Sequence, residues 1–163
     1  MSRYQLAQIN VAELKAPLDS PQLKDFVDNL DRINALAEGT PGFVWRLTGD
    51  GNDATELRPM GEKIIVNYSI WRDVETLKNF VYSTAHVEIL KRKREWFERM
   101  KLNYVLWWVP AGRIPTVEEA VAKLEHLRAH GPSADAFHFG EAYSAPDAVD
   151  AGTPFPAGDG CPA

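Results

Sequence analysis

The sequence predicts an α+β fold in which strands and helices share one chain of domain size. The 163 residues fit a single domain of roughly 100–200 residues. Segments whose apolar residues alternate with a period of two are separated by segments whose apolar residues recur every three or four positions. Hydrophobic residues make up 45% of the chain and charged residues 25%, which is typical of a globular protein.

Composition argues against several classes of partner. The formal net charge is −5, and a domain without a strongly basic face is a poor match for nucleic-acid phosphates. No run approaches the ~18 apolar residues of a membrane span, and the N-terminus lacks the apolar run of a secretory signal. The single cysteine, Cys161, cannot form an internal disulfide, which fits a reducing cytosol. We therefore expect a cytoplasmic protein that binds neither nucleic acid nor membrane.

The pattern predicts strands and helices in an alternating order. Strands are indicated by residues that alternate between two faces, and helices by one apolar stripe between start and stop signals. The predicted strands cover residues 4–11, 43–47, 63–71 and 103–109, with a short fifth strand at residues 136–139. The predicted helices cover residues 20–38, 73–81, 83–100 and 116–130.

Capping residues mark three of the helix starts. Ser20 precedes Pro21, a residue that suits the first helical position because it has no N–H to leave unpaired. Asp73 precedes the next helix, and Thr116 forms a capping-box pattern with Glu119. These residues predict side-chain caps at positions 20, 73 and 116.

The predicted order is β-α-β-β-α-β, followed by an appended helix and short strand, and it matches the ferredoxin-like split β-α-β unit. Such a sheet has helices on one face only. Strands 63–71 and 103–109 carry apolar residues on both faces, so we expect a homodimer that packs two sheets face to face. We assign residues 1–143 to one domain and the Ala-, Pro- and Gly-rich residues 144–163 to a disordered or loosely draped tail.

Common catalytic motifs are absent from the chain. It has no phosphate-binding glycine loop, no HExxH zinc motif, no cysteine pair and no G-x-S-x-G elbow. His126 and His130 lie four residues apart, but solvated histidines at a helix end explain that spacing better than a metal site does. His86 differs, because Leu90 and Phe97 place it on the apolar side of its helix. Both a core histidine and a pocket histidine fit this position.

Aromatic and basic residues suggest further site positions. Trp71 ends the strand 63–71 and shares a face with Asn67, an arrangement that suits a small-molecule cavity. Arg92 and Arg94 belong to a basic run that is either an ion-paired helix surface or an anion clamp for a carboxylate or propionate.

Two groups of residues carry a family resemblance. Residues 71–80 (WRDVETLKNF), followed by Ser83 and His86, resemble the dimeric α+β barrel superfamily, which includes antibiotic-biosynthesis and haem-degrading monooxygenases. Residues 86–97 and 105–112 (VLWWVPAG), together with segments up to Phe137, look like an uncharacterised bacterial family, the domain of unknown function numbered 3291. This second resemblance covers about residues 4–140 and implies the dimeric barrel fold.

The resemblance also implies positions for a haem. In haem-degrading members, an Asn on the first strand, a Trp at the end of the third strand and a His on the next helix surround the haem, and the His ligates the iron. The matching residues here are Asn10, Trp71 and His86. Arg92 or Arg94 would then contact the propionates.

Three functional hypotheses follow. The preferred one is a cofactor-independent monooxygenase-like enzyme acting on an aromatic or polycyclic substrate, with His86 as base and Asn67 as oxyanion partner. The second is a haem-binding or haem-degrading protein, and the third is a non-catalytic ligand-binding or structural homodimer.

The candidate site residues are common to these hypotheses. The proposed catalytic residues are His86, Trp71 and Asn67. We expect no metal unless His86 ligates haem iron. The proposed substrate- or haem-binding residues are Asn10, Trp45, Tyr68, Arg92, Arg94, Phe97 and Trp107.

Overall fold

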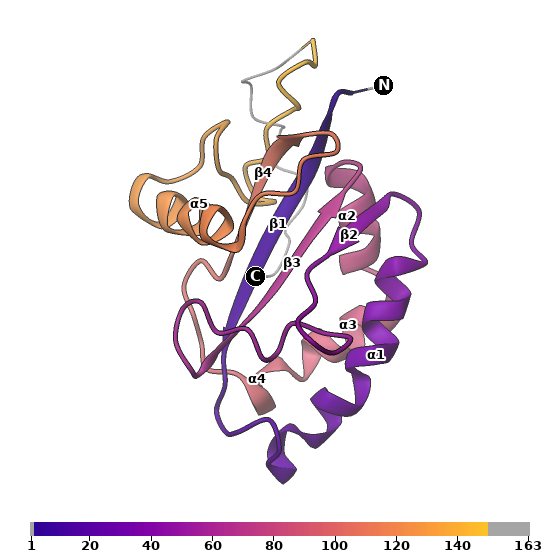
Figure 1. The fold of residues 1–163 in the computed structure, drawn as a ribbon, viewed down its shortest axis with the longest axis vertical. Helices are drawn as coiled ribbons and strands as arrows, with labels where there is room; N and C mark the ends of the chain where they lie inside the picture. The colour runs from indigo at the N-terminus through magenta and orange to yellow at the C-terminus, as the bar shows by residue number, and fades with distance from the viewer. Residues whose placement is uncertain (1, 150–163) are drawn as a thin grey trace.

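The chain folds around one four-stranded sheet with helices on both of its faces (Figure 1). The computed structural model describes residues 2–149, and residue 1 and residues 150–163 lie outside this description. The strands are β1 (Tyr4–Glu13), β2 (Phe43–Arg46), β3 (Ile64–Trp71) and β4 (Tyr104–Pro110). The helices are the 3-10 helix η1 (Pro21–Leu23), α1 (Lys24–Glu38), α2 (Val74–Val81), α3 (Thr84–Lys91), α4 (Lys93–Trp96) and α5 (Val117–His130). None of the helices in the described residues is long and apolar enough to cross a membrane.

The sheet has the strand order β2-β3-β1-β4, and every neighbouring pair is antiparallel. This order, with the chain path β1-α1-β2-β3-α2-β4, is the ferredoxin-like arrangement that the sequence predicts. The register places Gln8 of β1 opposite Ser69 of β3, and Asn10 opposite Asn67. Polar residues therefore meet in pairs at the centre of the sheet.

Alternation along the strands separates the two faces of the sheet. Leu6, Trp71 and Leu106 pack on the face that α1 and α2 cover. The neighbouring residues Ile9 and Tyr68 point to the other face. The prediction that alternate residues of β3 and β4 point to opposite faces of the sheet is confirmed.

The expectation that helices cover only one face is wrong. The appended helix α5 lies across the sheet from α1–α4 (Figure 1), and it buries Ala120, Leu124 and Leu127 against the second face. Val105 of β4 is fully buried in the same cluster. The apolar character of this face therefore has an explanation within a single chain.

Two of the predicted helix caps are present and one is not. Asp73 accepts a hydrogen bond from the Thr76 backbone N–H at 2.8 Å, and Thr116 does the same for Glu119 at 3.1 Å. Ser20 makes no cap, because its hydroxyl donates to the Pro17 carbonyl and a 3-10 turn precedes α1. Helix α1 starts at Lys24 without a side-chain cap.

The predicted helix 83–100 is broken into two short helices. Helix α3 ends at Lys91 and α4 ends at Trp96. The following Phe97 is extended and forms an isolated bridge with Leu14, while the Glu98 backbone N–H donates to the Glu13 carbonyl. Pairing with the end of β1 therefore replaces the last turn of the expected helix.

The predicted strand 136–139 is also shorter than expected. Only Phe137 pairs with the sheet, through an isolated bridge to Leu106, and its side chain is fully buried. Of the predicted tail, Ser144 is buried and Asp147 accepts hydrogen bonds from Ser2 and Arg3. The rest of that tail, from residue 150, lies outside the described residues.

The difference between the two capping positions can be tested. Replacing Asp73 removes an acceptor for the first turn of α2, so Asp73→Ala should lower the free energy of unfolding by about 1 kcal/mol. Ser20→Ala should leave it nearly unchanged, since Ser20 caps no helix. Urea denaturation of both variants measures this. Equal losses of stability in the two variants would contradict the assignment.

Candidate functional site

A cavity of about 230 Å³ lies between the sheet and helices α1, α2 and α3. For comparison, an engineered apolar cavity of about 150 Å³ binds benzene. The strands supply a polar floor, whereas the helices supply mostly apolar walls. The residues that line the cavity include Gln8, Asn10, Phe43, Arg46, Asn67, Ser69, Trp71, Phe80, Val81, His86 and Phe97.

Gln8 is the centre of the polar floor. Its side-chain amide donates to the Ser69 hydroxyl at 2.7 Å and to the Asn67 side-chain oxygen at 2.8 Å. Asn10 donates to the Gln8 side-chain oxygen at 3.0 Å. The Trp71 indole N–H donates to Ser69 at 2.9 Å. Buried polar groups need such partners, so the network both permits the polar floor and fixes the position of Trp71.

Stacked aromatic rings connect Trp71 to His86. The rings of Trp71 and Phe80 are stacked, with centroids 5.3 Å apart and an angle of 21° between their planes. The His86 ring lies against Phe80 at 4.7 Å, and Phe43 meets Trp71 edge-on at 5.4 Å. Trp71 is only 1% exposed, so these contacts fix its ring in the wall of the cavity.

His86 has a defined hydrogen-bond partner on one side of its ring. Its Nδ1 atom lies 2.9 Å from the Val81 carbonyl oxygen. A carbonyl can only accept, so Nδ1 carries the proton of this bond and the neutral ring has a free lone pair on Nε2. Burial lowers the pKa of His86 below its ordinary value, although the bond to Val81 opposes part of this shift. At neutral pH the residue is therefore an unprotonated base beside the cavity.

Half of the sequence-predicted site residues meet at this cavity. His86, Trp71, Asn67, Asn10 and Phe97 all line it. Asn10 lies well inside β1 rather than near the strand's end, because the strand continues for three more residues to Glu13. The residues with the strongest chemical rationale are thus brought together.

The aromatic residues Trp45, Tyr68 and Trp107 lie on the opposite face of the sheet. Strand alternation explains this placement, since Tyr68 stands between Asn67 and Ser69. The Tyr68 hydroxyl donates to the Pro115 carbonyl at 2.7 Å, and burial raises its pKa. These three residues cannot contact a ligand held against His86.

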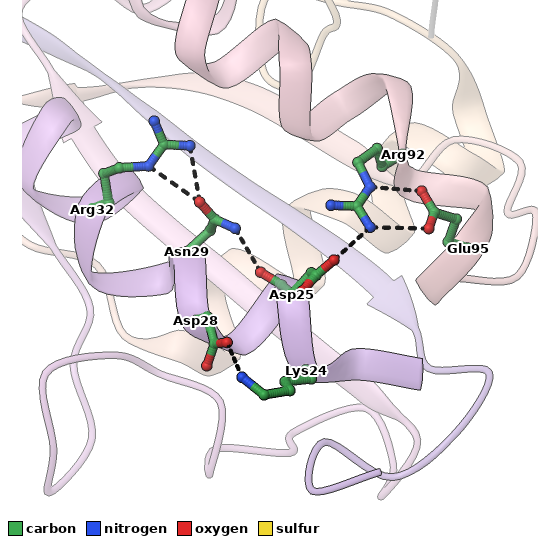
Figure 2. Close-up of polar contacts among 7 residues, drawn as sticks. All are labelled: Lys24, Asp25, Asp28, Asn29, Arg32, Arg92 and Glu95. Carbon is green, nitrogen blue, oxygen red and sulfur yellow. Dashed lines mark hydrogen bonds and ion pairs between the residues drawn. The ribbon is translucent and has the colours of Figure 1, made fainter. Parts of the chain in front are cut away.

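Of the two interpretations of the basic run, an ion-paired helix surface or an anion clamp, Arg92 fits the ion-paired surface. Figure 2 shows Arg92 between Asp25 of α1, at 2.8 Å, and Glu95 of α4, at 2.7 Å. The two carboxylates raise the pKa of Arg92. Arg94 is exposed and contacts the Glu98 carbonyl. Neither arginine lines the cavity, so Arg92 instead connects α1 to α4.

Gln8, Ser69 and Arg46 are polar residues of the cavity that were not among the sequence-predicted site residues. Gln8 interrupts the apolar segment LAQI in the central strand, and a polar residue in such a place requires a buried partner. Arg46 follows the segment FVW in an edge strand. A polar residue that interrupts an apolar strand was therefore the sequence signal for these site residues. This signal is weaker than a motif, because it does not show which residue the polar side chain will contact.

No group of three or more His, Cys, Asp or Glu side chains within the described residues could hold a metal ion. His126 and His130 do lie close together, with ring centroids 4.7 Å apart. The polar groups that line the cavity include the neutral imidazole of His86, side-chain amides and hydroxyls, the guanidinium of Arg46, and the charged side chains of Lys93 and Asp53.

Comparison with known proteins gives one family match and several similar structures. Residues 5–153 match the model of the family described as Domain of unknown function (DUF3291). No curated protein matches the chain.

In three of the similar solved structures, the match to this protein covers nearly all of the other chain. SnoaB, a cofactor-independent oxygenase from Streptomyces nogalater, is 14% identical over 68% of this chain and 95% of its own, with a TM-score of 0.44. PA3566 from Pseudomonas aeruginosa is 12% identical over 71% and 98%, with a TM-score of 0.47. Rv0793 from Mycobacterium tuberculosis is 12% identical over 69% and 98%, with a TM-score of 0.46.

The protonation state of His86 can be observed directly. Two-dimensional ¹⁵N NMR of the imidazole side chains should show Nδ1–H and an unprotonated Nε2 at pH 7. The titrating pKa should lie below the ordinary value of about 6.5. The Nε2–H tautomer, or a pKa above the ordinary value, would contradict the geometry.

The contribution of the polar floor can be measured by denaturation. Gln8→Leu removes the donor to Ser69 and Asn67 and the acceptor for Asn10, so we expect a loss of about 1–3 kcal/mol in the free energy of unfolding. The matched control is Gln5→Leu, in the same strand, whose side chain makes no hydrogen bond with other described residues. A Gln8 variant as stable as this control would show that the network contributes little.

Proposed function

The chain belongs to the DUF3291 family, and we propose that it is a cofactor-independent oxygenase that acts on a small aromatic substrate in the cavity beside His86. The observation that carries the proposal is the His86 ring, whose Nδ1–H is held by the Val81 carbonyl while its Nε2 lone pair remains available. A half-buried neutral imidazole can take a proton from a bound molecule, and general bases work best with pKa values near the working pH.

The polar floor supports the developing negative charge. Ser69 accepts two hydrogen bonds, from Gln8 and Trp71, so its own hydroxyl proton is left to donate. The Asn67 oxygen accepts from Gln8 and Asn10, which leaves its side-chain N–H groups as donors. Donors fixed before the reaction stabilise an oxyanion more effectively than mobile water does. The substrate oxygen would therefore lie over Asn67 and Ser69.

The reaction class is the conversion of an activated CH₂ group into a carbonyl by O₂. His86 removes one proton, and the resulting carbanion forms a C–O bond with O₂. Protonation gives a hydroperoxide, which loses water to leave the C=O group. The substrate carbon supplies all four electrons, one oxygen atom enters the product and the other leaves as water. No external reductant is required.

The cavity size limits the substrate. Ligand pockets for drug-sized molecules measure about 300–1,000 Å³. Of the aromatic and polycyclic substrates expected from the sequence, a volume of about 230 Å³ favours a compound with one or two aromatic rings, placed against Trp71 and Phe80. The rings would stack or pack edge-on as the wall residues do.

A haem does not fit this site. His86 presents a free Nε2, which a haem iron would require. However, a porphyrin is larger than the molecules that fill a cavity of this volume, and the predicted propionate partners, Arg92 and Arg94, lie outside it. No step of the proposed reaction involves haem.

The proposed homodimer remains a prediction. Because α5 already buries the second face of the sheet, burial of that face does not by itself require another copy. A purely ligand-binding role also remains a prediction. It would use the same cavity, but His86 would not act as a base.

Oxygen consumption tests the proposed activity. One- and two-ring compounds with an activated CH₂ group, 2-tetralone among them, should support O₂ uptake and incorporate one ¹⁸O atom from ¹⁸O₂. His86→Gln should lower kcat by about 10²–10⁴-fold. In the native enzyme, kcat should fall as pH decreases through the pKa of His86, which burial holds below its ordinary value, because only the neutral ring accepts a proton.

The control for this experiment is His126→Gln on α5, outside the cavity, which should retain full activity. If the CH₂ group exchanges its hydrogens for deuterium in a reaction that requires His86 but consumes no O₂, the oxygenase proposal is wrong and the role of His86 as a base stands. Oxygen uptake that is unaffected by His86→Gln would overturn both.

A further inference from the structure

Arg46 is a nearly buried cation at the edge of the cavity, and the reaction above makes no use of it. Only 10% of its side chain is exposed, and the residue lines the cavity. It is the cross-strand partner of Ser69, so its side chain shares the cavity-facing side of the sheet with the polar floor. Buried polar groups normally have hydrogen-bond partners, so the donors of a nearly buried guanidinium should all be accounted for.

The protein satisfies only part of the Arg46 guanidinium. Its Nε donates to Glu38 at 2.8 Å, and one Nη atom donates to Asn52 at 2.9 Å. A guanidinium has five N–H donors, and no other hydrogen bond links these donors to the described residues. Three donors are thus left over on a side chain that faces the cavity.

The unused donors favour an anionic partner. The guanidinium fork matches a carboxylate, which can accept two parallel hydrogen bonds. Glu38 does not cancel this attraction, since its side chain is 49% exposed and its charge is screened by solvent. Lys93 and Asp53 also line the cavity and carry opposite charges. An anion inside the cavity would therefore meet one positive charge at Arg46.

Arg46 and His86 lie at different parts of one continuous wall. Ser69 is opposite Arg46 in the sheet and holds the indole of Trp71. Trp71 stacks on Phe80, which in turn contacts His86. An aromatic ring placed in the cavity beside this wall would thus have the guanidinium towards one end and the imidazole towards the other.

We propose that the natural ligand of this cavity is an aromatic carboxylate, whose carboxylate binds Arg46 while its ring lies against Trp71 and Phe80. This inference rests on the proposed function in taking the cavity as the substrate site, and it adds the substrate class. The carboxylate orients the ring, so that the reacting carbon is presented to His86.

Binding of matched probes tests the assignment without any turnover. The probes are 2-naphthoate and its neutral isostere 2-naphthamide, titrated by calorimetry, with the indole N–H resonance of Trp71 as the reporter of the site. Native protein should bind the carboxylate about 10–100-fold more tightly than the amide. Arg46→Gln should abolish this preference, whereas Arg46→Lys should retain part of it because the charge remains.

Two further variants keep the test decisive. Glu38→Gln removes the carboxylate that competes for Arg46, so naphthoate should bind more tightly than it does to native protein, and this result does not depend on a change at Arg46. The matched control is Arg113→Gln. Arg113 pairs with Glu119 outside this cavity, so the variant should keep the native preference.

The outcomes separate this inference from the proposed oxygenase. Equal binding of the two probes, a preference that survives Arg46→Gln, or binding that leaves the Trp71 resonance unmoved would overturn it. His86→Gln should still prefer naphthoate. If it does and no substrate consumes O₂, the carboxylate site stands and the oxygenase fails. If a neutral substrate turns over equally well in native protein and Arg46→Gln, the oxygenase stands and the carboxylate site fails.

Discussion

The buried hydrogen bonds of Gln8 are the constraint on which the cavity depends. Gln8 lies in β1, the strand that pairs with both β3 and β4, and its side chain connects Ser69, Asn67 and Asn10 across the sheet. The network leaves the Ser69 hydroxyl proton and the Asn67 side-chain N–H groups without acceptors, and an apolar helix packed directly on them would bury these donors unsatisfied. The helices therefore stand away from the middle of the sheet, and the space between becomes the cavity.

The same network determines where the aromatic wall stands. Ser69 holds the indole of Trp71, Trp71 supports Phe80, and Phe80 supports the ring of His86. The capping box at Asp73 fixes the start of the helix that carries Phe80. The position of the base is thus set by local hydrogen bonds at both ends of α2, since Val81 at its C-terminal end binds the histidine ring. Such support is what keeps a catalytic group in one geometry.

Helix α5 changes what the sheet can be used for. In the ferredoxin-like arrangement one face of the sheet is open, but here α5 buries Leu124 and Leu127 against it. The two faces consequently have separate roles. One is a closed apolar core that stabilises the domain, and the other carries a polar floor with a cavity, so changes in the cavity need not disturb the larger core.

The sequence predicted the order of the elements and the facing of β3 and β4, because strand and helix periods are local properties. Two of the helix caps were also predicted, at Asp73 and Thr116. The placement of α5 was missed, since an amphipathic stripe shows that a helix packs but not on which face. The break after α3 was missed for a similar reason, because a long-range bridge between Leu14 and Phe97 overrides local helical preference.

In the candidate site, too, the sequence predicted what depends on neighbouring residues and missed what depends on contacts between distant segments. His86, Trp71 and Asn67 were predicted because each has a neighbour in the sequence that reveals its face. The two arginines were assigned from charge density, which is the weaker argument. A run of basic residues on a helix finds carboxylates nearby, as Arg92 does with Asp25 and Glu95. A single arginine in a strand, flanked by apolar residues, has fewer partners within reach of its own segment. Arg46 is such a residue, and its neighbours leave three of its five N–H donors unused at the cavity.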